Sequence, residues 1–200
     1  QSDFCLVGQW VMSKIICGID EVGRGAWAGP MCVGVVLTHE DFAIEGLTDS
    51  KKLSPKRRQS LIPEIQKQSV YISVGSASPT EIDAYGLTKG LVLATERALS
   101  AVEDFGIDQI ILDGTDNYLR NTKYTNLVTC IPKADLTEPS VSAASIVAKE
   151  FRDTMMACFT SPVYGDYSFG KHSGYVTKLH KEQVATHGIS LIHRKLWKVS

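Results

Sequence analysis

The segment IICGIDEVGRG, residues 15–25, decides the fold and the chemistry of this chain. Its first residues are apolar and rich in isoleucine, which is typical of a buried strand, and they end at two adjacent carboxylates, Asp20 and Glu21. Unpaired carboxylates resist burial, so the simplest compensation is a divalent cation. The glycine turn that follows exposes backbone N–H groups and the guanidinium of Arg24, which suit a phosphate or a sugar edge. The segment therefore predicts an enzyme that acts on a phosphodiester.

The composition is that of an ordinary globular protein. The 200 residues carry a formal net charge of −1 and suit one domain with at most a small appendage. No apolar run approaches the roughly 20 residues that a membrane-spanning helix needs, and the first eleven residues lack the features of a signal peptide. The five cysteines are scattered without a CxxC pair, which favours free thiols in a reducing cytoplasm over zinc or disulfides.

Basic residues gather in two places, although the total charge is close to zero. Lys51 and Lys52 with residues 56–58 form the first cluster, and residues 193–195 with Lys198 form the second. Clusters of this kind are candidates for contact with nucleic acid.

Hydrophobic periodicity and turn residues predict alternating strands and helices. The short glycine turn predicts an antiparallel first pair of strands, and Gly34 in the second strand marks a bulge or a close backbone approach. Ser54 is expected to cap one helix, and Gly106 to end another. The order indicates an α/β domain with a mixed sheet. The expected strands are 15–20, 31–37, 70–77, 109–114 and 127–131, and the expected helices are 55–67, 79–85, 87–105, 140–159 and 177–186.

Three of the predicted strands are followed by an acid. Asp20 and Glu21 end the first strand, Asp113 ends the fourth, and Asp135 lies just past the fifth. If these strands are neighbours, the four acids converge at one edge of the sheet, where open α/β sheets place their sites. Their mutual repulsion and their hard oxygen atoms favour Mg²⁺ or Mn²⁺, which suits hydrolysis of a phosphodiester with two metal ions. Each acid alone is equally well explained as a turn or capping residue.

Several motifs together resemble the ribonuclease HII family, the type 2 ribonucleases H. They are GIDEVGRG at 18–25, DSKKLS at 49–54, LDG at 112–114, KAD at 133–135, SAASIVAK at 142–149 and SGY at 173–175. The match runs in order from about Lys14 to the tail, and the first block and the SAASI block are highly specific.

The resemblance implies an RNase H-like mixed five-stranded sheet flanked by helices, with a small C-terminal helical part. It divides the chain into an N-terminal extension (1–11, with Met12 as a candidate start), a catalytic domain (12–160) and a C-terminal substrate-binding loop and helices (161–200). It implies a monomeric endonuclease without membrane contact. Its partners would be RNA–DNA hybrids and duplex DNA containing ribonucleotides, which it would nick on the 5′ side of a single ribonucleotide to leave 3′-OH and 5′-phosphate ends.

The resemblance also assigns roles to single residues. Its acidic metal ligands fall on Asp20, Glu21, Asp113 and Asp135, as the strand-end argument expects. Its turn that reads the ribose 2′-OH falls on Gly23, Arg24 and Gly25, its phosphate-contacting loop on Ser50, Lys51 and Lys52, and its junction-stacking tyrosine on Tyr175. The 2′-OH is the group that distinguishes RNA from DNA.

Two other functions are weighed against this one. A nuclease of the ribonuclease HIII type would cut only continuous hybrid, but the Gly-Arg-Gly turn and Tyr175 count against it. A non-catalytic nucleic-acid binding module would need no acidic cluster. Outside the motifs, Lys149 and Arg152 are expected to support the acids or a phosphate. Surface or loop positions are expected for the four histidines His172, His180, His187 and His193, and a packed position for Trp197.

Overall fold

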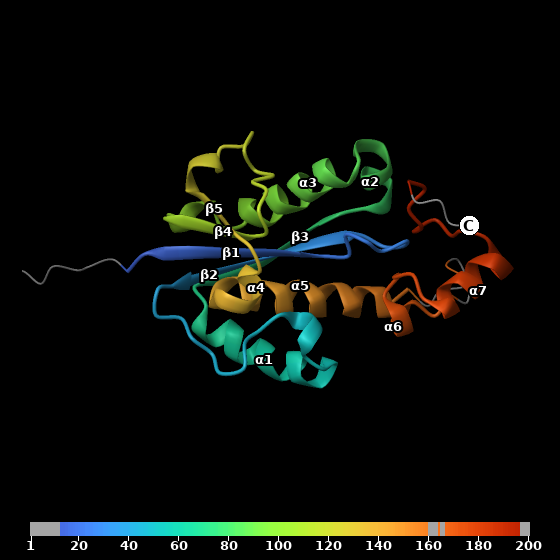
Figure 1. Cartoon of the computed structure of the whole chain (residues 1–200), viewed down its shortest axis with the longest axis horizontal. Helices are drawn as coiled ribbons and strands as arrows, with labels where there is room; N and C mark the ends of the chain where they lie inside the picture. Colours follow the sequence, from blue (N-terminus) through green and yellow to red (C-terminus); the bar gives the residue numbers. More distant parts are fainter. Residues whose placement is uncertain (1–12, 160–163, 165–166, 197–200) are drawn as a thin grey trace, which may run out of the picture.

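A mixed five-stranded sheet forms the centre of the structure, a computed structural model that describes residues 13–159, 164 and 167–196 (Figure 1). The strand order is β3-β2-β1-β4-β5, in which β1 is antiparallel to β2 and parallel to β4. The predicted sheet and its antiparallel first pair are confirmed. The strands are β1 (Ile15–Val22), β2 (Met31–His39), β3 (Tyr71–Ala77), β4 (Gln109–Asp113) and β5 (Val128–Ile131).

Helices cover both faces of this sheet (Figure 1). Helix α3 lies on one face over a core that includes Ile19, Leu99 and Leu112, whereas α5 and α1 lie on the other. Ser54 caps α1 by accepting from the N–H of Arg57, as expected. The helices are α1 (Pro55–Gln68), α2 (Pro79–Tyr85), α3 (Leu87–Ser100), α4 (Ala134–Thr137), α5 (Pro139–Ala157), α6 (Phe169–His172) and α7 (Lys178–His187), and the 3-10 turns are η1 (Ser50–Lys52), η2 (Glu103–Phe105) and η3 (Thr125–Leu127).

Helix α5 lies unusually close to the sheet. A Cβ atom added to Gly34 would stand 2.4 Å from the carbonyl oxygen of Ala144, so only glycine permits this approach. The pairing of β1 with β2 runs without interruption through Asp20 and Gly34, so the glycine marks the close approach and not a bulge. The run of small residues in α5 is therefore what brings this helix against the end of β1.

Some element boundaries differ from the sequence-based expectation. Helix α3 ends at Ser100, not near Phe105, because Val102 turns into the core in a non-helical conformation and the chain continues as η2. The short helix α6 lies between the expected helices 140–159 and 177–186, where no helix was expected. No described helix is long and apolar enough to cross a membrane. Residues 1–11, residues 160–163 and Trp197 lie outside the described residues, so the expected division of the chain at residues 11 and 160 and the packing of Trp197 stay predictions.

Candidate active site

The register of the sheet brings Asp20 and Asp113 side by side. Ile19 on β1 pairs with Leu112 on β4, and both side chains are buried in the core beneath α3. Because side chains alternate along a strand, the next residue on each strand points to the opposite face, toward α5. Asp20 is only 8% exposed, and the nearby hydroxyl of Ser145 on α5 partly offsets the rise that burial causes in its pKa.

Asp135 joins these two acids from α4. The preceding residue, Lys133, adopts a left-handed conformation with φ 59°, which is costly for a side chain other than glycine. This turn lets the N–H of Ala134 donate to Oδ1 of Asp113 over 2.8 Å and places Asp135 in the first turn of α4, only 8% exposed. The strained turn thus ties α4 to the end of β4.

The charges of these acids act on one another. Burial raises the pKa of Asp20 to about 7, and the charges of Glu21 and Asp113 add to this effect. Burial and the charge of Asp113 also raise the pKa of Asp135. The pKa of Lys51 is raised despite its partial burial, because it faces these same acids and Asp49. The acids therefore share one electrostatic neighbourhood, in which a bound cation would favour the ionised carboxylate of Asp20.

The donor set fits a hard divalent cation, since it consists of carboxylate oxygens alone. Among the described residues, no three His, Cys, Asp or Glu side chains converge as a ready ligand group. A bound ion would therefore have to draw the carboxylates of Asp20, Glu21, Asp113 and Asp135 closer together.

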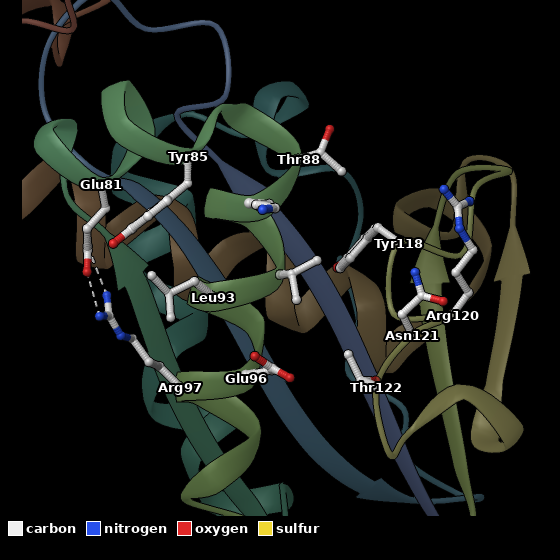
Figure 2. A pocket seen from close by; sticks show the side chains of 12 residues that line it. Glu81, Tyr85, Thr88, Leu93, Glu96, Arg97, Tyr118, Arg120, Asn121 and Thr122 are labelled. Atoms are coloured by element: carbon white, nitrogen blue, oxygen red, sulfur yellow. Dashed lines mark hydrogen bonds and ion pairs between the residues drawn. The ribbon is translucent and has the colours of Figure 1, made fainter.

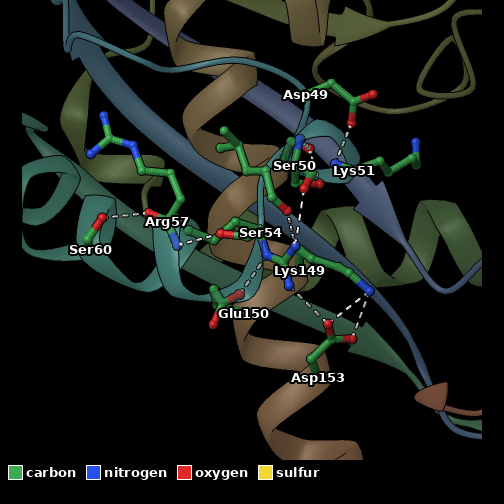
Figure 3. Close-up of polar contacts among 12 residues, drawn as sticks. Asp49, Ser50, Lys51, Ser54, Arg57, Ser60, Lys149, Glu150 and Asp153 are labelled. Atoms are coloured by element: carbon green, nitrogen blue, oxygen red, sulfur yellow. Dashed lines mark hydrogen bonds and ion pairs between the residues drawn. The ribbon is translucent and has the colours of Figure 1, made fainter. Parts of the chain in front are cut away.

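The loop Ser50–Lys52 lies beside Asp20 and Glu21 and is held by hydrogen bonds from Arg58. Figure 3 shows Ser50 and Lys51 of this loop together with Glu150 of α5. The guanidinium of Arg58 is buried and donates to the carbonyls of Ser50 and Leu53, and it contacts Glu150 on α5 over 2.6 Å. The hydroxyl of Ser50 is hydrogen-bonded to Ser145 over 2.8 Å, so Ser50 anchors the loop. Lys51 and Lys52 remain exposed beside the acidic residues.

The turn after β1 divides into a supported half and an open half. The N–H of Gly23 donates to the hydroxyl of Tyr175, and the carbonyls of Gly23 and Arg24 both accept from Arg194. Gly23 has φ +84° and a Cβ there would stand 2.2 Å from Nε of Arg152, so glycine is required. A Cβ on Gly25 would meet nothing within 4 Å, so the packing of the described residues does not explain this glycine.

Arg152 and Arg194 have structural contacts that the sequence did not indicate. Both are 0% exposed. Arg152 donates to the carbonyls of Ala28, Pro30 and Ser173, so the support that we expected it to give to the acids or a phosphate is not a direct contact with the acids. Lys149 forms an ion pair with Asp153 over 2.9 Å. Arg152 and Lys149 both lie against the ring of Tyr175, at 5.2 and 5.4 Å from its centroid.

Asp20 and Glu21, the turn and the lysine loop line one cavity of about 390 Å³, whereas Asp113 and Asp135 do not line it. Its lining includes Asp20, Glu21, Gly25, Lys51 and Tyr175. A second cavity of about 670 Å³ lies between α3 and the loop that contains Tyr118 and Arg120, and it holds the Glu81–Arg97 ion pair (Figure 2). Because none of the four acids lines that second cavity, we assign the chemistry to the first.

Sequence reasoning missed the supporting residues of this site. Arg58 and Arg194 belong to the two basic clusters that suggested contact with nucleic acid, yet both guanidinium groups are buried against backbone carbonyls. Membership of a basic cluster was the signal that the sequence offered, and it does not distinguish a buried arginine from an exposed one.

Comparison with known proteins gives a consistent family. The model of the family described as ribonuclease HII matches residues 17–200. The chain is 43% identical over 185 residues to ribonuclease HII of Streptomyces avermitilis, covering 92% of this chain and 77% of that protein. It is 39% identical to ribonuclease HII of Shewanella pealeana, covering 90% of this chain and 86% of that protein.

Solved structures show the same fold. The ribonuclease H2 of Pyrococcus horikoshii has a TM-score of 0.73 and 28% identity, with 92% of this chain and 94% of that chain covered. The ribonuclease HII of Archaeoglobus fulgidus, solved in complex with PCNA, also has a TM-score of 0.73, with 29% identity and coverage of 92% and 95%. A ribonuclease HIII solved with Mn²⁺ has a TM-score of 0.73 at 19% identity, with coverage of 94% and 68%, and this likeness shows the fold alone.

Proposed function

This chain belongs to the ribonuclease HII family of type 2 ribonuclease H endonucleases, and from this premise we propose that it nicks duplex DNA on the 5′ side of a single embedded ribonucleotide. The same site would cut the RNA strand of RNA–DNA hybrids. In both reactions the products carry 3′-OH and 5′-phosphate ends.

One observation supports ribose recognition above all others. Arg24 and Gly25 are exposed residues, and among the described residues their N–H groups and the carbonyl of Gly25 make no hydrogen bond, whereas the N–H and the carbonyl of Gly23 are both occupied. A hydroxyl group donates one hydrogen bond and accepts others, so free donors beside a free acceptor match the ribose 2′-OH. A deoxyribose would leave these backbone groups without a partner.

The acids would hold the metal ions of the reaction. We assign Asp20, Glu21, Asp113 and Asp135 as ligands, with Mg²⁺ or Mn²⁺ as the ion. When bound, such ions activate a water molecule and stabilise the leaving oxygen of a phosphodiester. The exposed ammonium groups of Lys51 and Lys52 would meet backbone phosphates of the duplex, which positions the strand without reading its sequence.

Tyr175 would recognise the nucleotide that follows the ribonucleotide. Its hydroxyl accepts from the N–H of Gly23 over 3.0 Å, which fixes the ring directly beside the proposed ribose-reading turn. A sugar packed on this ring has no room for a second 2′-OH. We therefore expect Tyr175 to favour a DNA residue there and so to favour an isolated ribonucleotide.

A DNA duplex with one internal ribonucleotide tests this function directly. We expect a single nick on its 5′ side with Mg²⁺ or Mn²⁺, and no nick with a chelator. Asp113→Asn should lower the rate at least about a hundredfold, because an amide oxygen is a weaker ligand than a carboxylate. The amide still accepts the hydrogen bond from Ala134, so the fold and duplex binding should persist.

The matched control is Asp116→Asn, which removes the exposed acid that forms an ion pair with Arg120 and should leave the rate within about twofold. Near-normal rates for Asp113→Asn would refute the metal assignment. Cleavage of continuous hybrid without any nick at the single ribonucleotide would instead indicate activity of the ribonuclease HIII type.

A further inference from the structure

Three histidines form a buried cluster behind Tyr175. His172 on α6, His180 on α7 and His193 are 8%, 0% and 2% exposed, so the expectation of surface or loop histidines is wrong for these three and holds for His187. The rings of Tyr167 and Phe169 pack against them. Buried imidazoles need a hydrogen-bond partner at each nitrogen, and their partners reveal which nitrogen carries the proton.

The partners of His193 and His180 determine their protonation. The backbone N–H of Ser190 can only donate, so Nδ1 of His193, 2.9 Å away, accepts and the proton lies on Nε2. That Nε2–H points at Nε2 of His180 over 3.0 Å, which must therefore be an acceptor. The proton of His180 is then on Nδ1, which donates to the carbonyl of Tyr175 over 2.9 Å.

The hydrogen bonds consequently run in one direction. They lead from the N–H of Ser190 through His193 and His180 to the backbone of Tyr175. His172 supports the same segment separately, because its Nδ1 accepts from the N–H of Gly174 and its Nε2 donates to the carbonyl of Tyr167. Tyr175 is thus fixed at its carbonyl by imidazole and at its hydroxyl by Gly23.

We propose that His193 and His180 are positioning residues that act as a neutral, one-way hydrogen-bond relay and hold Tyr175 in register with the ribose-reading turn. This inference rests on the proposed function, because it concerns the preference for a single ribonucleotide that we assign to Tyr175. The relay touches neither substrate nor metal ligands, so its loss should reduce that preference and leave cleavage of continuous hybrid largely intact.

The surroundings of the cluster keep the relay neutral. The groups that face the two rings are Trp27, Tyr167, Phe169, His172 and the hydroxyl of Ser190, and among the described contacts of His180 and His193 there is no carboxylate. Burial lowers the pKa of His193 to about 4 and lowers the pKa of His180 as well. A second proton on His180 would set its N–H against the N–H of His193, so the relay tolerates only the neutral form.

Two substitutions of His180 separate positioning from packing. Asparagine places an amide near Nδ1 and can still donate to the Tyr175 carbonyl, whereas glutamine reaches the Nε2 position and leaves that carbonyl without its donor. The readout is kcat/KM on the single-ribonucleotide duplex divided by kcat/KM on continuous hybrid. We expect His180→Asn to keep this ratio within about twofold of the parent value and His180→Gln to lower it about tenfold. Both variants should lower the unfolding temperature by a similar amount.

Control variants make the outcomes separable. His187→Gln, on the exposed side of α7, should change neither kcat/KM value, and Tyr175→Ala should lower the ratio at least as far as His180→Gln. Equal ratios for the two His180 variants, with a lowered ratio for Tyr175→Ala, would refute the relay and leave the proposed function standing. An unchanged ratio for Tyr175→Ala would refute the role of Tyr175 itself.

The same contrast is available at His193 if a His180 variant does not fold. His193→Gln keeps a donor near Nε2 for His180 and should preserve the ratio, whereas His193→Asn removes that donor and should lower it. The reverse order would overturn the proposed direction of the hydrogen bonds.

Discussion

The glycine turn after β1 lies between an acidic site and a C-terminal support, and buried charge is handled in opposite ways in these two regions. At the acidic site, Asp20, Glu21, Asp113 and Asp135 bring like charges together, and burial and repulsion raise the pKa of Asp20 to about 7. At the C-terminal support, defined here as His172, His180, His193 and Arg194, each buried charge or ring meets backbone groups of matching polarity. The acidic site is therefore destabilising until a cation binds, and the support is stabilising without one.

This difference suggests how the chain divides its tasks. A site that binds a cation keeps carboxylates whose mutual repulsion lowers the stability of the fold. A neighbouring region must then supply contacts that raise it. Gly23 lies where the two regions meet, with its carbonyl bonded to Arg194 and its N–H bonded to Tyr175. Substitutions on either side should therefore change stability in opposite directions.

The largest effect on stability is expected from Arg194→Met. The substitution removes the donor from the carbonyls of Arg24 and Gly29 and leaves the carbonyl of Gly23 with the N–H of Ala26, 3.3 Å away, as its remaining donor. Unsatisfied groups of this kind cost about 1 kcal/mol or more each, so unfolding should become easier by about 3 kcal/mol, or roughly 6–12 °C in unfolding temperature. Thermal unfolding followed by circular dichroism measures this.

The neighbouring residue provides the control for charge. Lys195→Met removes the same charge from an exposed side chain and should alter the unfolding temperature by about 1–2 °C at most. If both variants lose equal stability, Arg194 acts through the net charge of the tail and not through the carbonyls, and the contrast between the two regions fails.

The acidic site was the easier region to predict from the sequence. Asp20, Asp113 and Asp135 each follow an apolar run, and the period of a strand and the ordering of a sheet are enough to bring such residues together. The support was hidden because its residues look like surface residues. Arg194 is flanked by His193 and Lys195, and only tertiary packing decides which of the three side chains turn inward. Similarly, no sequence pattern indicated that Ser50 binds Ser145 or that Val102 ends α3 early.

A smaller effect of the opposite sign is expected from Asp20→Asn in protein freed of metal with a chelator. Folding raises the pKa of Asp20 from 3.8 to about 7, so the stability that this carboxyl contributes is present below pH 3.8 and is lost as the pH rises through 7. At pH 8 the amide avoids this cost and should stabilise the protein by about 1–2 kcal/mol, or roughly 3–6 °C. The same substitution should abolish nicking.

Asp116→Asn again serves as the matched control, because the carboxylate of Asp116 is exposed. The unfolding temperature of this variant should stay within about 1 °C of that of the parent protein. Destabilisation by Asp20→Asn would mean that hydrogen bonds from Ser145 and Glu21 outweigh repulsion, and that the acidic site stabilises the fold like any other buried network.

The smallest effect concerns the pH dependence of the support. Because folding lowers the pKa of His193 to about 4, the unfolded chain binds more protons between that value and 6.5. The stability contributed by neutral His193 is therefore complete above pH 6.5 and decreases as the pH falls toward 4. Between pH 6.5 and 5 the loss should reach about 1 kcal/mol, or roughly 2–4 °C.

Comparison with His193→Asn isolates this effect from all other titrating groups, including the acids. Asparagine can still accept from the N–H of Ser190 but does not titrate, so the difference in unfolding temperature between parent and variant should narrow by 2–4 °C from pH 6.5 to 5. A constant difference would mean that His193 is protonated equally in the folded and unfolded chains. The folded protein would then hold a charged imidazolium at His193, 3.0 Å from the ring of His180. The C-terminal support would contain buried charge as the acidic site does, and the contrast between the two regions would fail.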